Sequence, residues 1–311
     1  MRDTFVKTLI ELAGHDPRIE LITGDLGFGV LKPFWESRPN QFTNAGIAEQ
    51  NMTTLAAGMA LEGKIVFTYS ISNFPTLRCL EQIRNDCAYH QANVKIVCVG
   101  GGLVYGALGM SHHATEDIAI MRALPGVLVA CPGDPAEAEA VTRSMVDWPG
   151  TCYLRLGRGG EKRLHEKLDN YRPGRALKIR DGRDLVIFST GAILSEAAEA
   201  AEMLEKKGLS AALYSFPTVK PLDGDLVLEC GRNFRLIATV EEHSRLGGLG
   251  GAVAEILTEE PSRAVLLRLG LADSYNPEVG GQDYLRRING LDSAGLAGRI
   301  ADIYAKYLYV S

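Results

Sequence analysis

Apolar residues in this chain gather in short continuous runs that alternate with segments of helical spacing. Thr4–Gly14, for example, repeats apolar side chains every three to four residues and ends at a glycine. The runs that predict buried strands in the first half are Ile19–Thr23, Lys64–Tyr69, Val94–Val99, Val127–Cys131 and Cys152–Leu156. Strands that are apolar throughout and separated by helices predict an α/β fold, with mostly parallel sheets covered on both faces.

The alternation is interrupted once, by a charged stretch with a Tyr-Arg-Pro-Gly turn at residues 161–181. This composition is typical of a linker. The pattern resumes after it with an amphipathic helix at Leu194–Lys207 and further apolar runs. Those runs predict strands at Leu185–Ser189, Ala211–Phe216, Leu236–Val240 and Ala264–Leu269. We therefore predict two domains, 1–160 and 182–311, each a mostly parallel sheet flanked by helices.

Bulk composition excludes several classes of protein. The net charge of −5 and the absence of a Lys/Arg run argue against a nucleic-acid binder. The longest apolar runs have the length of strands, and Met1-Arg2-Asp3 does not open a signal peptide, so no membrane association is expected. The six cysteines form no CxxC pair and most lie among apolar residues. They are typical of reduced core residues in a cytoplasmic protein.

A short strand at Gln41–Asn44 leads into Gly46-Ile47-Ala48-Glu49-Gln50-Asn51 and a helix of small residues to about Leu61. An acid in the first turn of a helix is stabilised by the helix dipole, which is one explanation for Glu49. The other is chemical. Its small neighbours let a ligand approach the backbone, and a poorly solvated glutamate can share a proton with a ligand nitrogen. Physical reasoning alone leaves both explanations open.

The stretch Phe42–Met52 resembles the pyrimidine-domain signature of the transketolase family, whose members use thiamine diphosphate. In that family the glutamate hydrogen-bonds the coenzyme's aminopyrimidine and so promotes loss of the proton from the thiazolium carbon. The resemblance assigns this role to Glu49. It also extends to Glu81–Asp86, in a long helix predicted at Phe74–His90.

Near the start of that helix, the family has an aromatic residue that stacks on the coenzyme pyrimidine. Phe74 matches that position. Many members carry a second aromatic one turn earlier, where this chain has Ile71. The resemblance therefore implies that Phe74, with Ile71 beside it, binds the coenzyme. Without the resemblance, ordinary core packing of Phe74 is the favoured interpretation.

The segment Gly109–Arg122 contains His112 and His113 followed by acids. Adjacent histidines rarely converge on one metal ion, so we predict no metal site here. The family carries Ser/Thr-His-Gln and then Glu-Asp-Ile-Ala-x-Met-Arg in this place. His112 matches the histidine that moves protons on substrate hydroxyls, a task that suits an imidazole near pH 7. His113 replaces the usual glutamine and is a further candidate for substrate binding.

At two positions this chain departs from the family pattern in ways that concern the acceptor substrate. Transketolases that act on sugar phosphates have a histidine at the position of Gly100 and an aspartate at that of Leu108. An altered acceptor site, open to a bulkier or less charged acceptor, is expected. Arg158 matches a family arginine near the substrate phosphate, although an exposed loop arginine is an equal alternative. Asp25 lies in a glycine turn after the first strand. A tight turn is the favoured interpretation there, and Asp25 is kept as a candidate substrate contact.

The family holds the coenzyme diphosphate and Mg²⁺ through Gly-Asp-Gly and a later asparagine. All three Gly-Asp pairs of this chain (Gly24-Asp25, Gly133-Asp134 and Gly224-Asp225) continue with Leu or Pro. The resemblance thus covers only the pyrimidine and C-terminal domains. It implies a partner subunit that supplies the diphosphate and Mg²⁺ half, in an α2β2 heterotetramer. Glu241-Glu242-His243-Ser244 is expected to form a structural turn or a subunit contact.

The resulting hypothesis is a subunit of a transferase that moves a two-carbon ketol unit from a ketose donor to an aldehyde or ketone acceptor. Three alternatives remain. They are transfer to an unusual acceptor such as an activated sugar, a β subunit of a 2-oxo-acid dehydrogenase decarboxylase, and an assembly subunit without chemistry. The presence of Glu49, Phe74 and His112 argues against the last.

Overall fold

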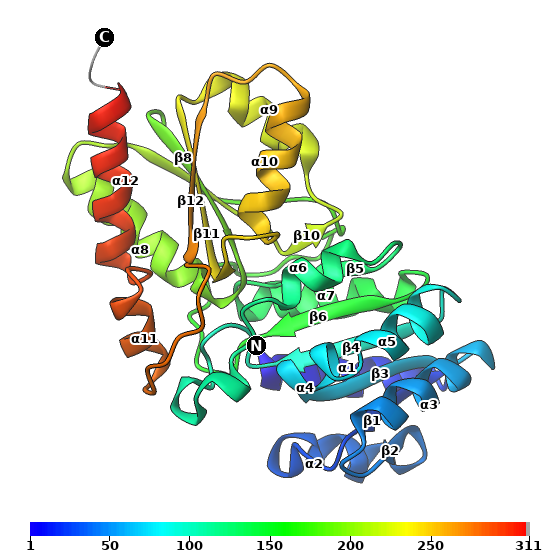
Figure 1. Ribbon diagram of the computed structural model, residues 1–311. Coiled ribbons are helices and arrows are strands. Elements are labelled where there is room, and N and C mark those ends of the chain that lie inside the picture. Colours follow the sequence, from blue (N-terminus) through cyan, green and yellow to red (C-terminus); the bar gives the residue numbers. More distant parts are fainter. Residues whose placement is uncertain (309–311) are drawn as a thin grey trace.

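The computed structural model describes residues 1–308 and contains two helix-flanked sheets, one in each half of the chain (Figure 1). The first has the strand order β10-β5-β6-β4-β3-β1-β2 and the second β12-β11-β8-β9-β7. Every neighbouring pair is parallel except β10 with β5 and β7 with β9. The predicted α/β architecture of two mostly parallel sheets is therefore confirmed.

The first half of the chain contains α1 (Arg2–His15), β1 (Ile19–Thr23), α2 (Phe28–Ser37), η1 (Pro39–Gln41), β2 (Phe42–Asn44), α3 (Glu49–Leu61), β3 (Ile65–Ile71), α4 (Asn73–Leu77), α5 (Leu80–Gln82), η2 (Ile83–Ala88), β4 (Val94–Val99), η3 (Gly106–Leu108), η4 (Met110–His112), α6 (Asp117–Ala123), β5 (Leu128–Ala130), α7 (Pro135–Asp147) and β6 (Cys152–Leu156). The second half contains β7 (Leu177–Arg180), β8 (Leu185–Thr190), η5 (Gly191–Ile193), α8 (Leu194–Lys206), β9 (Ala211–Ser215), β10 (Thr218–Lys220), α9 (Gly224–Asn233), β11 (Leu236–Ser244), α10 (Leu249–Glu259), β12 (Val265–Leu271), α11 (Gln282–Ile288) and α12 (Ser293–Leu308).

Each face of the first sheet has its own apolar core. On one face, α1, α2 and α7 pack through side chains such as Phe5, Phe34 and Met145. On the other face lie α3, η2 and α6, and this core continues into the second half through Phe188 and Leu249. The strands β1, β4, β6 and β8 are buried along their whole length. Burial on both faces explains why they appear in the sequence as continuous apolar runs.

The two halves are also joined through the sheet itself. Strand β10, which follows β9 of the second sheet, pairs antiparallel with β5 at the edge of the first. The Lys220 ammonium donates to the carbonyls of Arg122 (2.9 Å) and Leu124 (2.5 Å), which end α6. This crossing strand holds the second half against the first, so that loops of both halves meet on one side of the molecule.

The structure differs from the sequence-based expectations in four places. The helix predicted at Phe74–His90 is divided into α4, α5 and the π-helix η2, in which Tyr89 N bonds to Arg84 O. No bounds were predicted for helix α2, which begins after Gly27, where φ is +78. Strand β11 continues through Glu241–His243, so these residues do not form the structural turn that was one of the two expectations for them. Residues 177–180, within the predicted linker, form β7 and pair with β9.

All six cysteines are buried and carry free thiols. None of the described helices combines the length and apolar character needed to cross a membrane.

Candidate functional site

The candidate site lies along the carboxyl edge of the first sheet. Thr23, the last residue of β1, is paired with Asn44 on β2 and with Tyr69 on β3, so these strands end side by side. The loops that follow carry Asp25, Glu49 and Phe74. In parallel α/β sheets, this is the edge where ligands bind.

Glu49 is the first residue of α3, and its side chain is only 3% exposed. The chain reaches it through Gly46, whose φ of +73 favours glycine. Gly24 lies beside it, because a Cβ built there would stand 3.5 Å from Glu49 Cγ. Within residues 1–308, the carboxylate accepts a hydrogen bond only from Arg78. It caps no backbone N–H of α3, so its remaining lone pairs are available to a ligand.

Arg78 is a site residue that the sequence analysis missed. Its Nη1 donates to Glu49 Oε2 at 2.6 Å, and its guanidinium carbon lies 4.9 Å from the centre of the Phe74 ring. The arginine side chain is 47% exposed, whereas Glu49 is buried. The signal in the sequence was weak: Arg78 follows Phe74 by four residues, a spacing that puts two helical residues on one face.

His112 is also brought to this group. Its ring meets Phe74 edge-on, with the ring centres 5.3 Å apart. Ser111 Oγ lies 3.0 Å from His112 Nδ1, and Asn73 Nδ2 donates to the Ser111 carbonyl at 2.8 Å. These contacts orient the imidazole and leave Nε2 free of any partner among the described residues. Glu49, Phe74 and His112, which come from three separate segments, thus lie in one continuous cluster.

Asp25 follows β1 and Ile71 ends β3, so both lie at the same edge of the sheet as the cluster. Asp25 has φ +57, and it exchanges two hydrogen bonds with the Asn44 side chain, which also accepts from Gly46 N. Asp25 thereby fixes the β1 loop against the loop that carries Glu49. Ile71 ends β3 and is half-buried.

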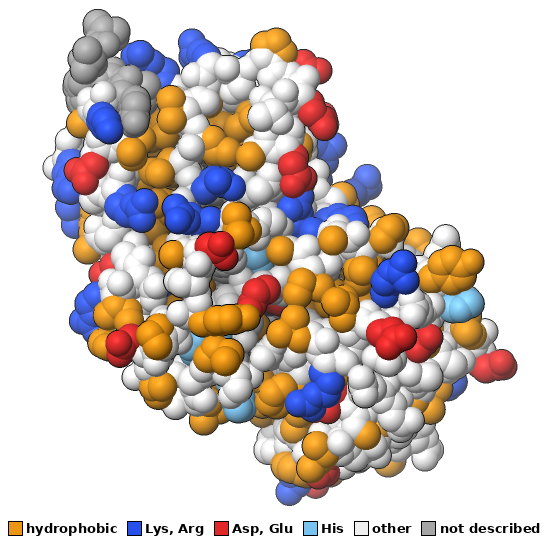
Figure 2. Space-filling model, viewed as in Figure 1, with side chains coloured by type: hydrophobic (Ala, Val, Ile, Leu, Met, Phe, Trp, Pro, Cys, Tyr) orange, Lys and Arg blue, Asp and Glu red, His pale blue; other side chains and the backbone are white. Residues whose placement is uncertain are grey.

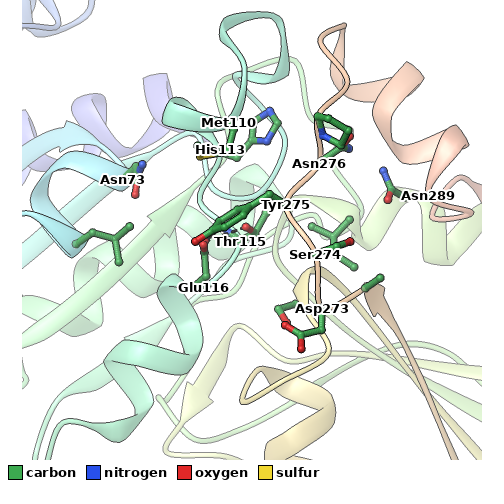
Figure 3. A pocket seen from close by; sticks show the side chains of 15 residues that line it. Asn73, Met110, His113, Thr115, Glu116, Asp273, Ser274, Tyr275, Asn276 and Asn289 are labelled. Atoms are coloured by element: carbon green, nitrogen blue, oxygen red, sulfur yellow. Dashed lines mark hydrogen bonds between the residues drawn. The ribbon is translucent and has the colours of Figure 1, made fainter.

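His113 makes no contact with this cluster, although it is the neighbour of His112. It is buried and lines a separate cleft of about 490 Å³, which does not include Glu49, Phe74 or His112 (Figure 3). Burial lowers the pKa of His113 below its ordinary value, against the opposing effect of a hydrogen bond to the Gly106 backbone. The ring is therefore neutral at neutral pH.

Arg158 lies farther along the same sheet edge, in the exposed loop after β6. Its guanidinium carbon is 6.0 Å from the centre of the Tyr105 ring. That ring also covers Gly100, where a Cβ would come within 2.1 Å of Tyr105 Cε2. Tyr105 thus occupies the space that a side chain at position 100 would need. Glycine in place of the family histidine and the position of the Tyr105 ring therefore go together.

The described residues contain one cluster with the composition of a metal site, formed by Asp134, Glu137 and His165. Asp134 caps α7 by accepting from Glu137 N, and its other oxygen accepts from the backbone N–H groups of Leu164 and His165. Oxygen atoms occupied by N–H donors are poorly disposed to bind a cation. This cluster therefore joins the segment after β6 to α7.

Comparison with known families matches residues 1–160 to the transketolase pyrimidine-binding domain and residues 174–295 to the transketolase C-terminal domain. The chain belongs to the transketolase family. The resemblance found in Phe42–Met52 and Glu81–Asp86 is therefore confirmed.

Within the family, the chain is 39% identical over 305 residues to a putative transketolase C-terminal section from Methanocaldococcus jannaschii, covering 97% of this chain and 95% of the relative. It is 38% identical to one of the subunits of the apulose-4-phosphate transketolase from Phocaeicola vulgatus, covering 95% and 94%. A split-gene transketolase structure, an inactive β4 tetramer, has 35% identity and a TM-score of 0.87, covering 97% and 96%. A Pichia stipitis transketolase, at 21% identity and TM-score 0.83, shares the fold over 46% of its length.

These similarities support a β-type subunit of a split transketolase-like enzyme. The family as a whole implies dependence on thiamine diphosphate.

Proposed function

We propose that this chain is the pyrimidine-binding subunit of a split thiamine-diphosphate enzyme. The enzyme transfers a two-carbon ketol unit from a ketose donor to an aldehyde or ketone acceptor. The observation that carries the proposal is the buried Glu49 carboxylate, which has lone pairs unused and is linked through Arg78 to Phe74 and His112. The names of the relatives, which include parts of split transketolases, support it.

The residues around Glu49 fit an aminopyrimidine ring. A carboxylate with free lone pairs suits a protonated ring nitrogen, and a half-buried Phe74 offers a ring face for stacking. Gly24 and Gly46 carry no side chain into this space. Ile71, at the end of β3, would lie against the bound ring. Thiamine diphosphate, when bound, supplies a thiazolium carbon that acts as a nucleophile toward a carbonyl. Glu49 would hold the pyrimidine and its proton, and Phe74 would orient the ring.

His112 would move protons on the substrate. Its Nδ1 is engaged by Ser111, so Nε2 is the nitrogen that can exchange a proton with a substrate hydroxyl. Asp25 would contribute to the donor side, from the loop fixed by Asn44. Arg158 would pair with an anionic group of the substrate, and His113 would contact the acceptor.

The chain would act only with a partner subunit, in an α2β2 heterotetramer. Apolar side chains that are exposed on and near α3 and α4 support a docking face on this side: Ile47, Leu55, Leu77 and Tyr89. Figure 2 shows hydrophobic side chains gathered over the half of the molecule that contains these helices. The partner would hold the diphosphate and Mg²⁺, because the cluster at Asp134 shares no residue with the group around Glu49.

An unusual acceptor, such as an activated sugar, is the second candidate, and the Tyr105 ring over Gly100 favours it. A histidine cannot occupy position 100 while Tyr105 lies there. The exposed Leu108 likewise offers no hydrogen bond to a hydroxyl.

Calorimetric titration of thiamine diphosphate with Mg²⁺ tests the proposal, using this chain alone, the partner alone and the mixture. Tight binding in the mixture alone is the expected result, because the coenzyme would lie between the chains. Tight binding by this chain alone would contradict the shared site. No binding in any sample would overturn the assignment of the coenzyme.

A further inference from the structure

A cleft of about 490 Å³ separates the two halves of the chain beside the candidate site. One wall consists of residues that follow η3 and precede α6, among them Met110, His113 and Glu116. The other is the segment after β12, residues 272–277. In Figure 3, Tyr275 reaches from this segment across the middle of the cleft toward Thr115 and Glu116. The cleft lies wholly within this chain.

Two buried polar atoms on its walls have no hydrogen-bond partner within residues 1–308. They are Nε2 of His113, a residue only 5% exposed, and Nδ2 of Asn276. Figure 3 shows these two side chains on facing sides of the cleft. An unsatisfied buried polar group costs about 1–3 kcal/mol, so such groups are rare unless something pairs with them. Two of them on facing walls indicate a ligand with hydrogen-bonding groups at this end of the cleft.

The lining defines the chemistry of that ligand. It contains side-chain amides and hydroxyls together with the carboxylates of Glu116 and Asp273, and none of its described residues is Lys or Arg. A phosphate would meet negative charge without a counter-charge and is disfavoured. Tyr275 is 72% exposed and presents an aromatic ring, which packs against the apolar face of a sugar. Amides, hydroxyls, carboxylates and one aromatic ring together suit a neutral ligand rich in hydroxyl groups.

The cleft shares its rim with the candidate site. Asn73 lines it and also donates to the Ser111 carbonyl, and the Ser111 hydroxyl contacts His112. Leu77, on the same short helix as Phe74, lines it as well. A molecule whose reacting carbonyl lies at His112 can therefore extend into the cleft.

We propose that this cleft binds a neutral, hydroxyl-rich group, and that this group is the part of the acceptor remote from its reacting carbonyl. The assignment to the acceptor rests on the proposed function. The binding itself is a property of this chain and needs neither coenzyme nor partner.

Saturation-transfer NMR on the full chain alone tests the binding. The probes are xylose and fructose, each compared with its terminal phosphate ester. We expect the neutral sugars to bind more tightly than the esters. Tyr275→Ala and Asn276→Leu should weaken this binding by about five-fold. Phe28→Ala, which removes an exposed aromatic side chain outside the cleft, is the matched control and should bind as the unsubstituted chain does. Equal binding by all variants, absence of binding, or preference for the esters would overturn the proposal.

Steady-state kinetics of the assembled enzyme show whether the bound ligand is the acceptor or a separate effector. If it is the acceptor, Tyr275→Ala raises the KM for the acceptor and leaves the KM for the donor and the affinity for thiamine diphosphate unchanged. If both KM values and the coenzyme affinity stay unchanged while added neutral sugar no longer alters turnover, the ligand is a separate effector and the acceptor assignment is wrong. Failure of the assembled pair to bind coenzyme would overturn the proposed function, yet sugar binding by the lone chain would persist.

Discussion

Two glutamate–arginine pairs in this molecule have opposite surroundings. At the sheet edge, Glu49 is buried but its partner Arg78 is 47% exposed, and no other described group donates to the carboxylate. Between the halves, Glu242 and Arg286 form an ion pair in which both side chains are nearly inaccessible. There the carboxylate also accepts from Leu103 N and from Gln282 Nε2.

This difference identifies Glu49 as a group that binds a ligand and Glu242 as a group that stabilises the fold. Glu242 has both oxygens engaged by donors from separate segments, and its partners keep the C-terminal elements against the first domain. A buried charge with complete compensation stabilises an arrangement and leaves nothing for a ligand. Glu49 lies at the carboxyl edge of a parallel sheet with capacity unused, as a group that awaits a ligand does. Both glutamates are buried and charged. They differ in the number of carboxylate lone pairs that accept no hydrogen bond.

Replacement of Glu242, the structural glutamate, should have the largest effect on stability. Glu242→Ala leaves the buried Arg286 with only the more distant Glu196 carboxylate, 3.6 Å away, so the free energy of unfolding should fall by about 3–5 kcal/mol. Glu49→Gln should lower it by less than about 1 kcal/mol, because Arg78 can turn to water. Urea denaturation of both variants gives the comparison. Equal losses of stability would contradict the distinction drawn between the two pairs.

Glu137 sharpens the comparison, because it is a buried acid with an unused oxygen outside the site. Burial raises its pKa from 4.5 to about 7, so the proton serves in place of a ligand. Between those values the folded chain binds more protons than the unfolded chain, and stability falls as pH rises.

Its partner His165 changes stability in the same direction. Burial opposes the charged ring, but the hydrogen bond to Asp134 leaves the pKa of His165 above its ordinary value. The stability that His165 adds is complete below pH 6.5 and is lost as pH rises through the folded pKa.

Glu137→Gln should therefore flatten the decline in stability between pH 5 and pH 7 by on the order of 2 kcal/mol. Urea denaturation across this range measures the decline. His165→Asn should remove only the contribution of His165 and leave the decline in stability that is due to Glu137. An unchanged slope in Glu137→Gln would show that Glu137 does not hold the proton.

The smallest effect is expected at Phe74, which contacts both Arg78 and His112 at the site. Phe74→Leu keeps an apolar side chain and removes the aromatic face. The Kd of the assembled enzyme for thiamine diphosphate should rise by about five- to ten-fold, the value of one aromatic contact. Calorimetry measures it. A Kd equal to that of the original chain would mean that Phe74 only packs the core.

The regular elements were predictable because their signals are local. Strands Ile19–Thr23, Val94–Val99 and Cys152–Leu156 have the same bounds in the sequence pattern and in the structure, since each is a continuous apolar run. Asp-Pro-Ala-Glu at residues 134–137 is a local signal of the same kind, and Asp134 caps α7. The π-helix η2 was not predictable, because its apolar spacing resembles that of a regular helix.

For the site, the sequence brought forward Glu49, Phe74 and His112 through a resemblance, and the structure places them together. The pairing of Arg78 with Glu49, 29 residues apart, depends on tertiary contacts that no sequence pattern carries. The same holds for the cleft at His113, whose lining comes from both halves of the chain. Tyr105 covers Gly100 from within the same loop, and its ring position depends on how that loop folds.

The most direct test of the central claim is the turnover of the assembled enzyme with Glu49→Gln. This variant keeps the size of the side chain and removes the charge. We predict that it folds, pairs with the partner and loses turnover by about 10²–10⁴-fold, because the pyrimidine proton no longer has an acceptor. Full turnover by a folded and paired Glu49→Gln enzyme would contradict the account.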